Sequence, residues 1–125
     1  MFEDEDMSNL DFSGMTIGGA VFTNCLFSKC QFNKTTMDQV NLINCNFSGS
    51  NFSGATWVDC NVIDCTFDNT TFNNIVFKDA NFVKPKISES RFIDCNMMET
   101  NFIAAIAKST DFSGSNLDFA SFLQC

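Results

Sequence analysis

The sequence contains no histidine and no tyrosine, and only one proline and one tryptophan. Without an imidazole, the chain cannot build a Ser-His-Asp triad, a Cys-His dyad or a histidine-ligated zinc site. Basic side chains are also scarce, with 7 Lys and Arg against 15 Asp and Glu, which gives a net charge of −8. Direct nucleic-acid binding depends on Lys and Arg that neutralise phosphates, so this balance argues against it.

Long apolar runs are absent as well. No stretch approaches the ~18 residues of a membrane span, and the acidic start of the chain differs from the basic start of a secretory signal. The hydrophobic fraction of 45% is nevertheless enough for a folded core. With 125 residues, the chain is expected to form a single domain over residues 1–125 that does not associate with a membrane.

Phenylalanine is abundant and recurs with a period of five. Residues whose numbers leave a remainder of 2 on division by five are apolar throughout, and they include 15 of the 16 Phe. The position two residues earlier is mostly small, with 19 Cys, Ala, Thr or Ser among 25 residues, and it holds all seven Cys. A period of five fits neither an α-helix nor a flat strand. It indicates a short extended piece followed by a turn, wound into coils that stack around an axial core.

These pentads resemble those of the pentapeptide-repeat family, as in Cys45-Asn46-Phe47-Ser48-Gly49 and Ala80-Asn81-Phe82-Val83-Lys84. The resemblance implies an all-β fold, a right-handed quadrilateral β-helix with four pentads per coil and about six coils. Residues 20 apart should then stack on the same face. Pro85 lacks the N–H that would pair with the next coil, so we expect a kink or bulge there.

One outward column is aliphatic, at a position that is otherwise polar. Contiguous exposed apolar surface usually marks an interface, although β-branched residues are also favoured in a ladder for structural reasons alone. The same face carries a column of asparagines that we expect to form a structural amide ladder. The candidate interface stripe consists of Ile43, Ile63, Val83, Ile103 and Leu123.

Another face is acidic, with five carboxylates against one lysine. Like charges one coil apart repel each other unless a cation or a basic partner meets them. This face is therefore either a binding surface for basic protein or a solvated surface that confers solubility. Its carboxylates do not complete a calcium shell, and we expect neither a metal nor a cofactor. The acidic face consists of Asp38, Asp59, Asp79, Glu99 and Asp118.

All seven Cys fall in the small inward series, where they are expected to be free thiols that act as small apolar residues. Stacked parallel side chains rarely reach the torsion of a disulfide, and three collinear thiolates do not make a tetrahedral metal site. Free thiols fit a reducing compartment. Since the family is commonest in bacteria, we expect a bacterial cytoplasmic protein.

The C-terminal coil should expose apolar core and unpaired strand edges. Phe119 is the only Phe outside the core series and is expected to point outward. We hypothesise a two-fold homodimer through this end, using Phe119, Phe122 and Leu123. The alternative is a monomer in which Phe119 folds over its own end.

Nothing in the sequence pairs a nucleophile with a base, so an enzyme is not expected. The sequence favours a non-enzymatic protein-binding rod, an interaction module or scaffold whose partner is unknown. The Phe- and Cys-rich pentads at 25–29 and 65–69 are similar to those of the quinolone-resistance group of the family. That resemblance implies an alternative function, a DNA mimic that binds DNA gyrase or topoisomerase IV and modulates quinolone sensitivity. The chain departs from that group in having fewer coils and no projecting loops.

Overall fold

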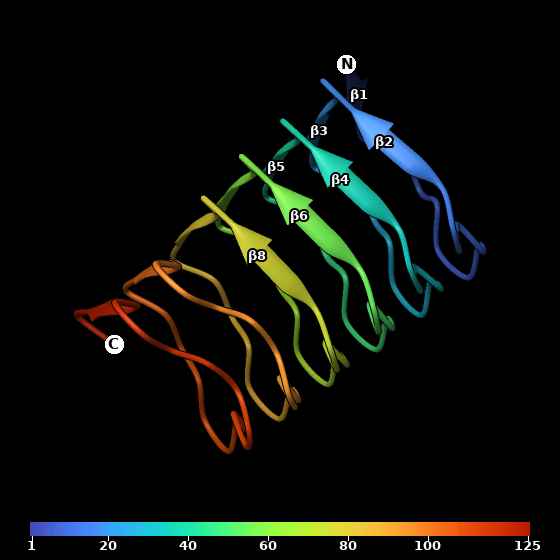
Figure 1. Ribbon diagram of the computed structural model, residues 1–125. Coiled ribbons are helices and arrows are strands. Elements are labelled where there is room, and N and C mark those ends of the chain that lie inside the picture. The colour runs from blue at the N-terminus through green and yellow to red at the C-terminus, as the bar shows by residue number, and fades with distance from the viewer.

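The computed structural model describes residues 1–125 as parallel strands and turns wound into about six stacked coils (Figure 1). The expected right-handed quadrilateral β-helix is confirmed. The chain contains no helix with the length and apolarity needed to cross a bilayer. The strands are β1 (Phe2–Glu3), β2 (Thr16–Gly18), β3 (Val21–Thr23), β4 (Thr36–Asp38), β5 (Asn41–Ile43), β6 (Thr56–Val58), β7 (Asn61–Ile63), β8 (Val76–Lys78), β9 (Asn81–Val83), β10 (Asn101–Ile103) and β11 (Ser121–Leu123).

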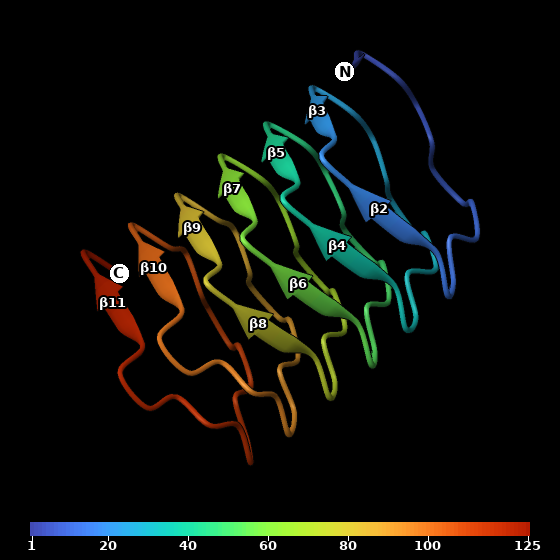
Figure 2. The same ribbon diagram turned by 45° about the horizontal axis from the view of Figure 1, so that its top comes forward.

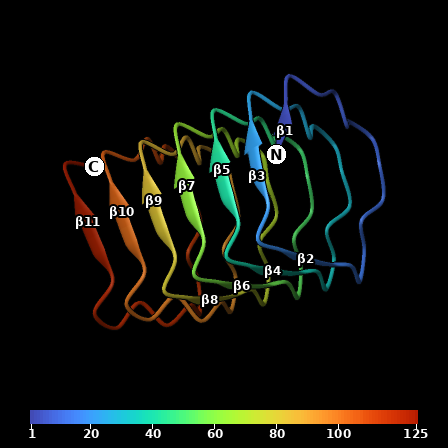
Figure 3. The ribbon, with the colours of Figure 1, turned by 90° about the horizontal axis from the view of Figure 1, so that it is seen from above.

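Two sheets of parallel strands form two neighbouring faces of the rod (Figure 2). The larger sheet has the order β1-β3-β5-β7-β9-β10-β11, and its strands lie side by side along the rod (Figure 3). The smaller sheet has the order β2-β4-β6-β8. Each strand pairs with residues 20 positions further along the chain, as Asn61 does with Asn81. The other two faces are joined by isolated bridges at the same interval, such as Leu26 with Asn46 and Gln31 with Asn51. Residues 20 apart therefore stack in columns, as expected.

A left-handed residue turns the chain at the corner after each pentad. The φ angles at this position lie between 51° and 74°, and most of the residues that adopt them are not glycine. Asn, Asp and Gly adopt this region at least cost, which explains the polar pairs that follow each large residue. Phe119 occupies such a corner with φ 58°, so its side chain leaves the core and is 84% exposed.

The smaller sheet ends at β8 because the residue type at the first position of its strands changes in the coils that follow. This residue is Thr or Val in the four strands, at Thr16, Thr36, Thr56 and Val76. In the next two coils it is Asn96 and Asn116, whose Oδ1 atoms accept the N–H of Met98 at 3.3 Å and of Asp118 at 2.9 Å. β-Branched residues favour extended backbone, whereas Asn stabilises a local turn through this bond.

The core is a set of aromatic stacks that run along the rod. The Phe27 and Phe47 rings stack at 4.8 Å, and Phe67 continues the stack at 5.0 Å from Phe47. The small series fills the space between the stacks, and 28 buried residues form one apolar cluster. All seven Cys are free and six are buried, with only Cys125 exposed. Burial raises the pKa of the Cys60 and Cys95 thiols, which keeps them in the unreactive protonated form.

The expected kink at Pro85 was wrong, because the ladder continues through it. The Ile106 N–H donates to the Pro85 carbonyl at 3.0 Å, and the Lys84 N–H donates to the Ile103 carbonyl at 2.7 Å. In this column the N–H of Cys45 donates to the Cys65 sulfur at 3.4 Å and not to a main-chain carbonyl. A proline therefore removes no main-chain bond at this position.

Trp57 provides a test of core packing. It is fully buried between Phe52 and Phe77, and its indole N–H has no acceptor. Trp57→Phe removes that buried donor, a gain of about 1–3 kcal/mol, and leaves a small cavity that costs about 1–2 kcal/mol. We expect its free energy of unfolding, measured by urea titration with circular dichroism, to stay within about 2 kcal/mol of wild type.

Phe67→Ala is the matched comparison, since it removes a whole ring from the same core. It should lose about 3–5 kcal/mol. A loss of similar size in Trp57→Phe would contradict the assignment of an unpaired indole N–H.

Candidate functional site

Three parallel columns of outward side chains lie beside the corner where the two sheets meet. One column is acidic, one is amide and one is aliphatic, and each spans three consecutive coils. Together they form what we call the nine-residue grid, which consists of Asp59, Asn61, Ile63, Asp79, Asn81, Val83, Glu99, Asn101 and Ile103.

The grid arises from one five-residue pattern that recurs every 20 residues, at 59–63, 79–83 and 99–103. An acid is followed by a small residue, Asn, a large apolar residue and a β-branched residue. The acids occupy left-handed corners with φ 51°, 57° and 61°. Asn and the β-branched residue are the first and third residues of β7, β9 and β10, so they point to the same outward side while the residue between them is buried.

The middle column is the expected amide ladder. Asn61 donates to Asn41 at 3.1 Å, Asn81 to Asn61 at 3.4 Å, and Asn101 to Asn81 at 2.9 Å. Because each bonded amide is held by the next, this column is an ordered, uncharged strip between the acids and the aliphatic residues.

The aliphatic column is continuous. Ile43, Ile63, Val83, Ile103 and Leu123 pair in register from β5 to β11. Ile63 is 38% exposed and Leu123 58%, while the other three are half-buried. The structure therefore brings the predicted stripe together, and its role as an interface stays a prediction.

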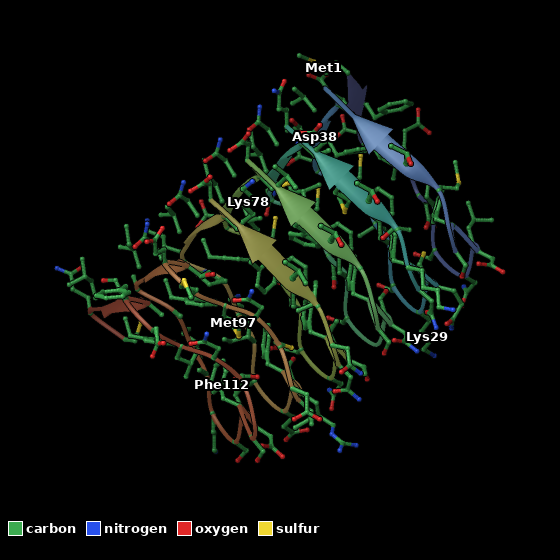
Figure 4. The ribbon with its side chains drawn as sticks, viewed as in Figure 1. Met1, Lys29, Asp38, Lys78, Met97 and Phe112 are labelled. Carbon is green, nitrogen blue, oxygen red and sulfur yellow. The ribbon has the colours of Figure 1, made fainter.

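The predicted acidic face is divided into two columns. Asp59, Asp79 and Glu99 are exposed and occupy successive coils at one corner. Asp38 and Asp118 are also exposed but lie one position away, in a column that contains Lys78 (Figure 4). Only the first three form an unbroken acidic column, since Val58, Lys78 and Met98 separate Asp38 from Asp118.

A hollow of about 230 Å³ lies beside this acidic column, where the smaller sheet ends. Val76 and Met98 contribute apolar surface, and Lys78, Asp79 and Glu99 contribute charge. No three acidic or Cys side chains converge as the ligands of a metal ion would.

The two ends of the rod expose apolar core. At the C-terminal end, Phe122 is 41% exposed on one ring face and stacks on Phe102 at 5.0 Å with the other. Phe119 points into solvent and does not fold over the last coil. At the N-terminal end, Phe2, Met7 and Phe12 help to line a hollow of about 370 Å³. Sequence reasoning named the C-terminal residues but missed this hollow, although Phe2 and Phe12 both belong to the core series.

Sequence reasoning also treated the acidic and aliphatic columns separately. The signal that joins them is the recurrence of acid, small, Asn, large and β-branched residues at intervals of 20, which is visible in the sequence once coils are aligned.

Comparison with protein families gives two matches that together cover most of the chain. A profile described as "Pentapeptide repeat region" matches residues 20–91, and one described as "Pentapeptide repeats (8 copies)" matches residues 95–125. None of the curated protein sequences compared with the chain matches it.

Several solved structures are similar in fold. Rfr23, a pentapeptide-repeat protein from the cyanobacterium Cyanothece 51142, matches with a TM-score of 0.62 at 10% identity, covering 94% of this chain and 90% of its own. A trypsin-treated variant of QnrB1, a plasmid-mediated fluoroquinolone resistance protein, matches with a TM-score of 0.45 at 18% identity. That match covers 95% of this chain and 71% of the QnrB1 chain. HetL, a pentapeptide-repeat protein involved in heterocyst differentiation regulation in Nostoc sp. strain PCC 7120, matches with a TM-score of 0.30 at 12% identity. That match covers 98% of this chain and 86% of HetL.

The first family match alone spans more than half of the chain, and the five-residue period, the parallel coils and the columns of the structure agree with it. The chain belongs to the pentapeptide-repeat family.

Proposed function

We propose that the protein is a non-enzymatic rod that binds another protein through one side. The observation that carries this proposal is the nine-residue grid, in which acidic, amide and aliphatic columns are ordered side by side over three coils. Exposed apolar surface next to a uniform charge is typical of an interaction site. The polar side chains stand in regular columns and do not converge on a reacting centre, which supports a binding role over catalysis.

We place this activity in the bacterial cytoplasm. Free thiols throughout the core are compatible with a reducing compartment. The partner we propose is a protein, with no direct contact to nucleic acid or to a membrane.

Capture from a bacterial lysate tests this proposal. Immobilised wild-type protein is compared with the triple variant Asp59→Asn/Asp79→Asn/Glu99→Gln and with Ile63→Ser/Ile103→Ser, which remove the charge and the aliphatic surface separately. We expect a specific partner that both variants lose. Binding through the acids should weaken steeply as salt rises, and binding through the aliphatic column should not. Retention of the same proteins by all three forms would contradict a role for the grid.

The second candidate function is mimicry of DNA, with a type II topoisomerase as the partner. The observation that favours it is that Asp59, Asp79 and Glu99 repeat on successive coils, which spaces them at about 4.8 Å along the rod. Such a column could enter the basic channel in which a topoisomerase holds DNA.

A supercoiling assay with DNA gyrase decides between the two candidates. Under the DNA-mimic hypothesis, the purified protein should inhibit gyrase, or protect it from a fluoroquinolone, at low micromolar concentration. The triple charge variant should abolish the effect. Unchanged supercoiling across the titration, with and without the drug, together with unchanged decatenation by topoisomerase IV, would exclude this candidate and leave the protein-binding rod.

We further propose that the rod forms a two-fold homodimer through its C-terminal coil. Phe119, Phe122 and Leu123 supply an apolar surface there, and all three are exposed. Phe119→Asp should reduce the mass measured by sedimentation from a dimer to a monomer, because it places a charge in the apolar contact. Phe2→Asp at the opposite end is the matched control and should leave the mass unchanged. A monomeric wild type would refute the dimer directly.

A further inference from the structure

We propose that the nine-residue grid receives an amphipathic α-helix of the partner protein, with a row of Lys or Arg along one flank of the helix's apolar face. This inference rests on the proposed function and adds the kind of partner that the surface fits. It depends on the asymmetry of the grid, on its spacing and on its fixed middle column.

The charge on the two sides of the aliphatic column differs. On one side, beyond the amides, stand Asp59, Asp79 and Glu99, which give three negative charges and no positive one. On the other side, the column beside the stripe holds Asp64, Lys84 and Ala104, which sum to zero. A partner with basic residues on only one flank of its apolar row therefore has a single favourable orientation.

The dimensions of the grid suit a helix that lies along the rod. Coils repeat at about 4.8 Å, and a helix advances about 5.4 Å per turn. Three helical turns therefore depart from three coils by less than about 2 Å, which long Lys or Arg side chains can absorb. The aliphatic and amide columns are two strand residues apart, about 6.6 Å. A helix about 10 Å wide covers both columns, so that its basic flank reaches the acids.

The amide column makes this arrangement specific. Its members each donate one N–H along the rod at 2.9–3.4 Å and so hold one another in place. The second N–H of each amide stays available to a polar side chain at the edge of the partner helix. The strip also holds the acids away from the aliphatic contact, where burial of unpaired charge would be costly.

A second copy of this chain fits the grid poorly. Its own grid has no basic column beside the aliphatic row, so two grids placed face to face would leave the carboxylates of both copies without a positive partner. The partner that complements the grid carries the opposite charge.

A designed peptide tests the inference directly. The probe is a synthetic helix of Leu, Ala and Lys, with Leu in one row and Lys along one flank. One control peptide has the same composition in scrambled order, and another has Glu in place of Lys. Binding is followed by ¹⁵N NMR titration, which reports both the affinity and the residues contacted.

We expect the Lys peptide to shift the resonances of residues 59–63, 79–83 and 99–103. Asp59→Asn/Asp79→Asn/Glu99→Gln should weaken its Kd about tenfold, since three exposed ion pairs are lost. The matched control is Asp94→Asn/Asp111→Asn/Glu89→Gln. It removes the same charges from exposed positions on other sides of the rod and should leave Kd within about twofold.

The apolar contribution has its own pair of variants. Ile63→Ser/Ile103→Ser should weaken Kd about tenfold through lost apolar contact. Leu26→Ser/Ile106→Ser changes exposed aliphatic residues on another face and should have no effect. All of these positions lie on the surface, and thermal unfolding followed by circular dichroism checks that each variant is folded.

The inference is overturned if the scrambled or Glu peptide binds equally well, if the control variants weaken binding as much as the grid variants, or if the shifts fall outside the grid. Failure of the inference is distinguishable from failure of the proposed function. A lysate partner that depends on the grid, together with no binding of the Lys peptide, rejects the helix and leaves the protein-binding role. A partner that is indifferent to every grid variant rejects both.

Discussion

Main-chain hydrogen bonds join each coil to the next at an interval of 20 residues, and this interval holds from the pairing of Phe2 with Phe22 to that of Phe102 with Phe122. Every other feature depends on it. Inside, the interval stacks Phe on Phe at 4.4–5.1 Å, as in the series Phe52, Phe72 and Phe92. Outside, it aligns residues of one kind into columns. One inserted residue would shift all the columns beyond it, so the constant period maintains the core and the surface together.

The corners make the constant period possible. Each pentad ends in a left-handed residue, and side chains as different as Asn44, Lys84 and Phe119 adopt this conformation. A non-glycine residue in this region costs energy, and the cost is offset because the neighbouring coils hold the corner by main-chain bonds. The Asp59 N–H donates to Lys78 O at 2.9 Å, and the Asn44 N–H donates to Ile63 O at 2.9 Å. The corners can therefore carry charged side chains, and the acids of the grid occupy three of them.

The sequence predicted the parts of the structure that depend on this period. The Phe series is buried except at the two ends of the rod, the Cys are free, the asparagines form their ladder and Phe119 points outward. The error at Pro85 had a local cause, because periodicity alone does not reveal that the N–H groups of its column donate to side-chain sulfur and not to a main-chain carbonyl. The end of the smaller sheet at β8 was not predicted either. It depends on a single bond from the Met98 N–H to the Asn96 side chain, and the same residue type at Asn101 joins a ladder and keeps its strand.

Because the core is the same on all sides of the rod, only outward side chains can distinguish one binding face from another. The four faces of the core are lined by the same two series of large and small residues, so the core does not distinguish one side of the rod from another. Differences between faces are confined to the outward positions of each pentad and to its corner. In residues 59–103 the outward positions form an acidic, an amide and an aliphatic column, always in that order. The strands that carry them are hydrogen-bonded to the coils before and after them. Because this scaffold is ordered before any partner arrives, little conformational entropy of the rod is lost on binding. Three modest columns can therefore act together as one recognition surface.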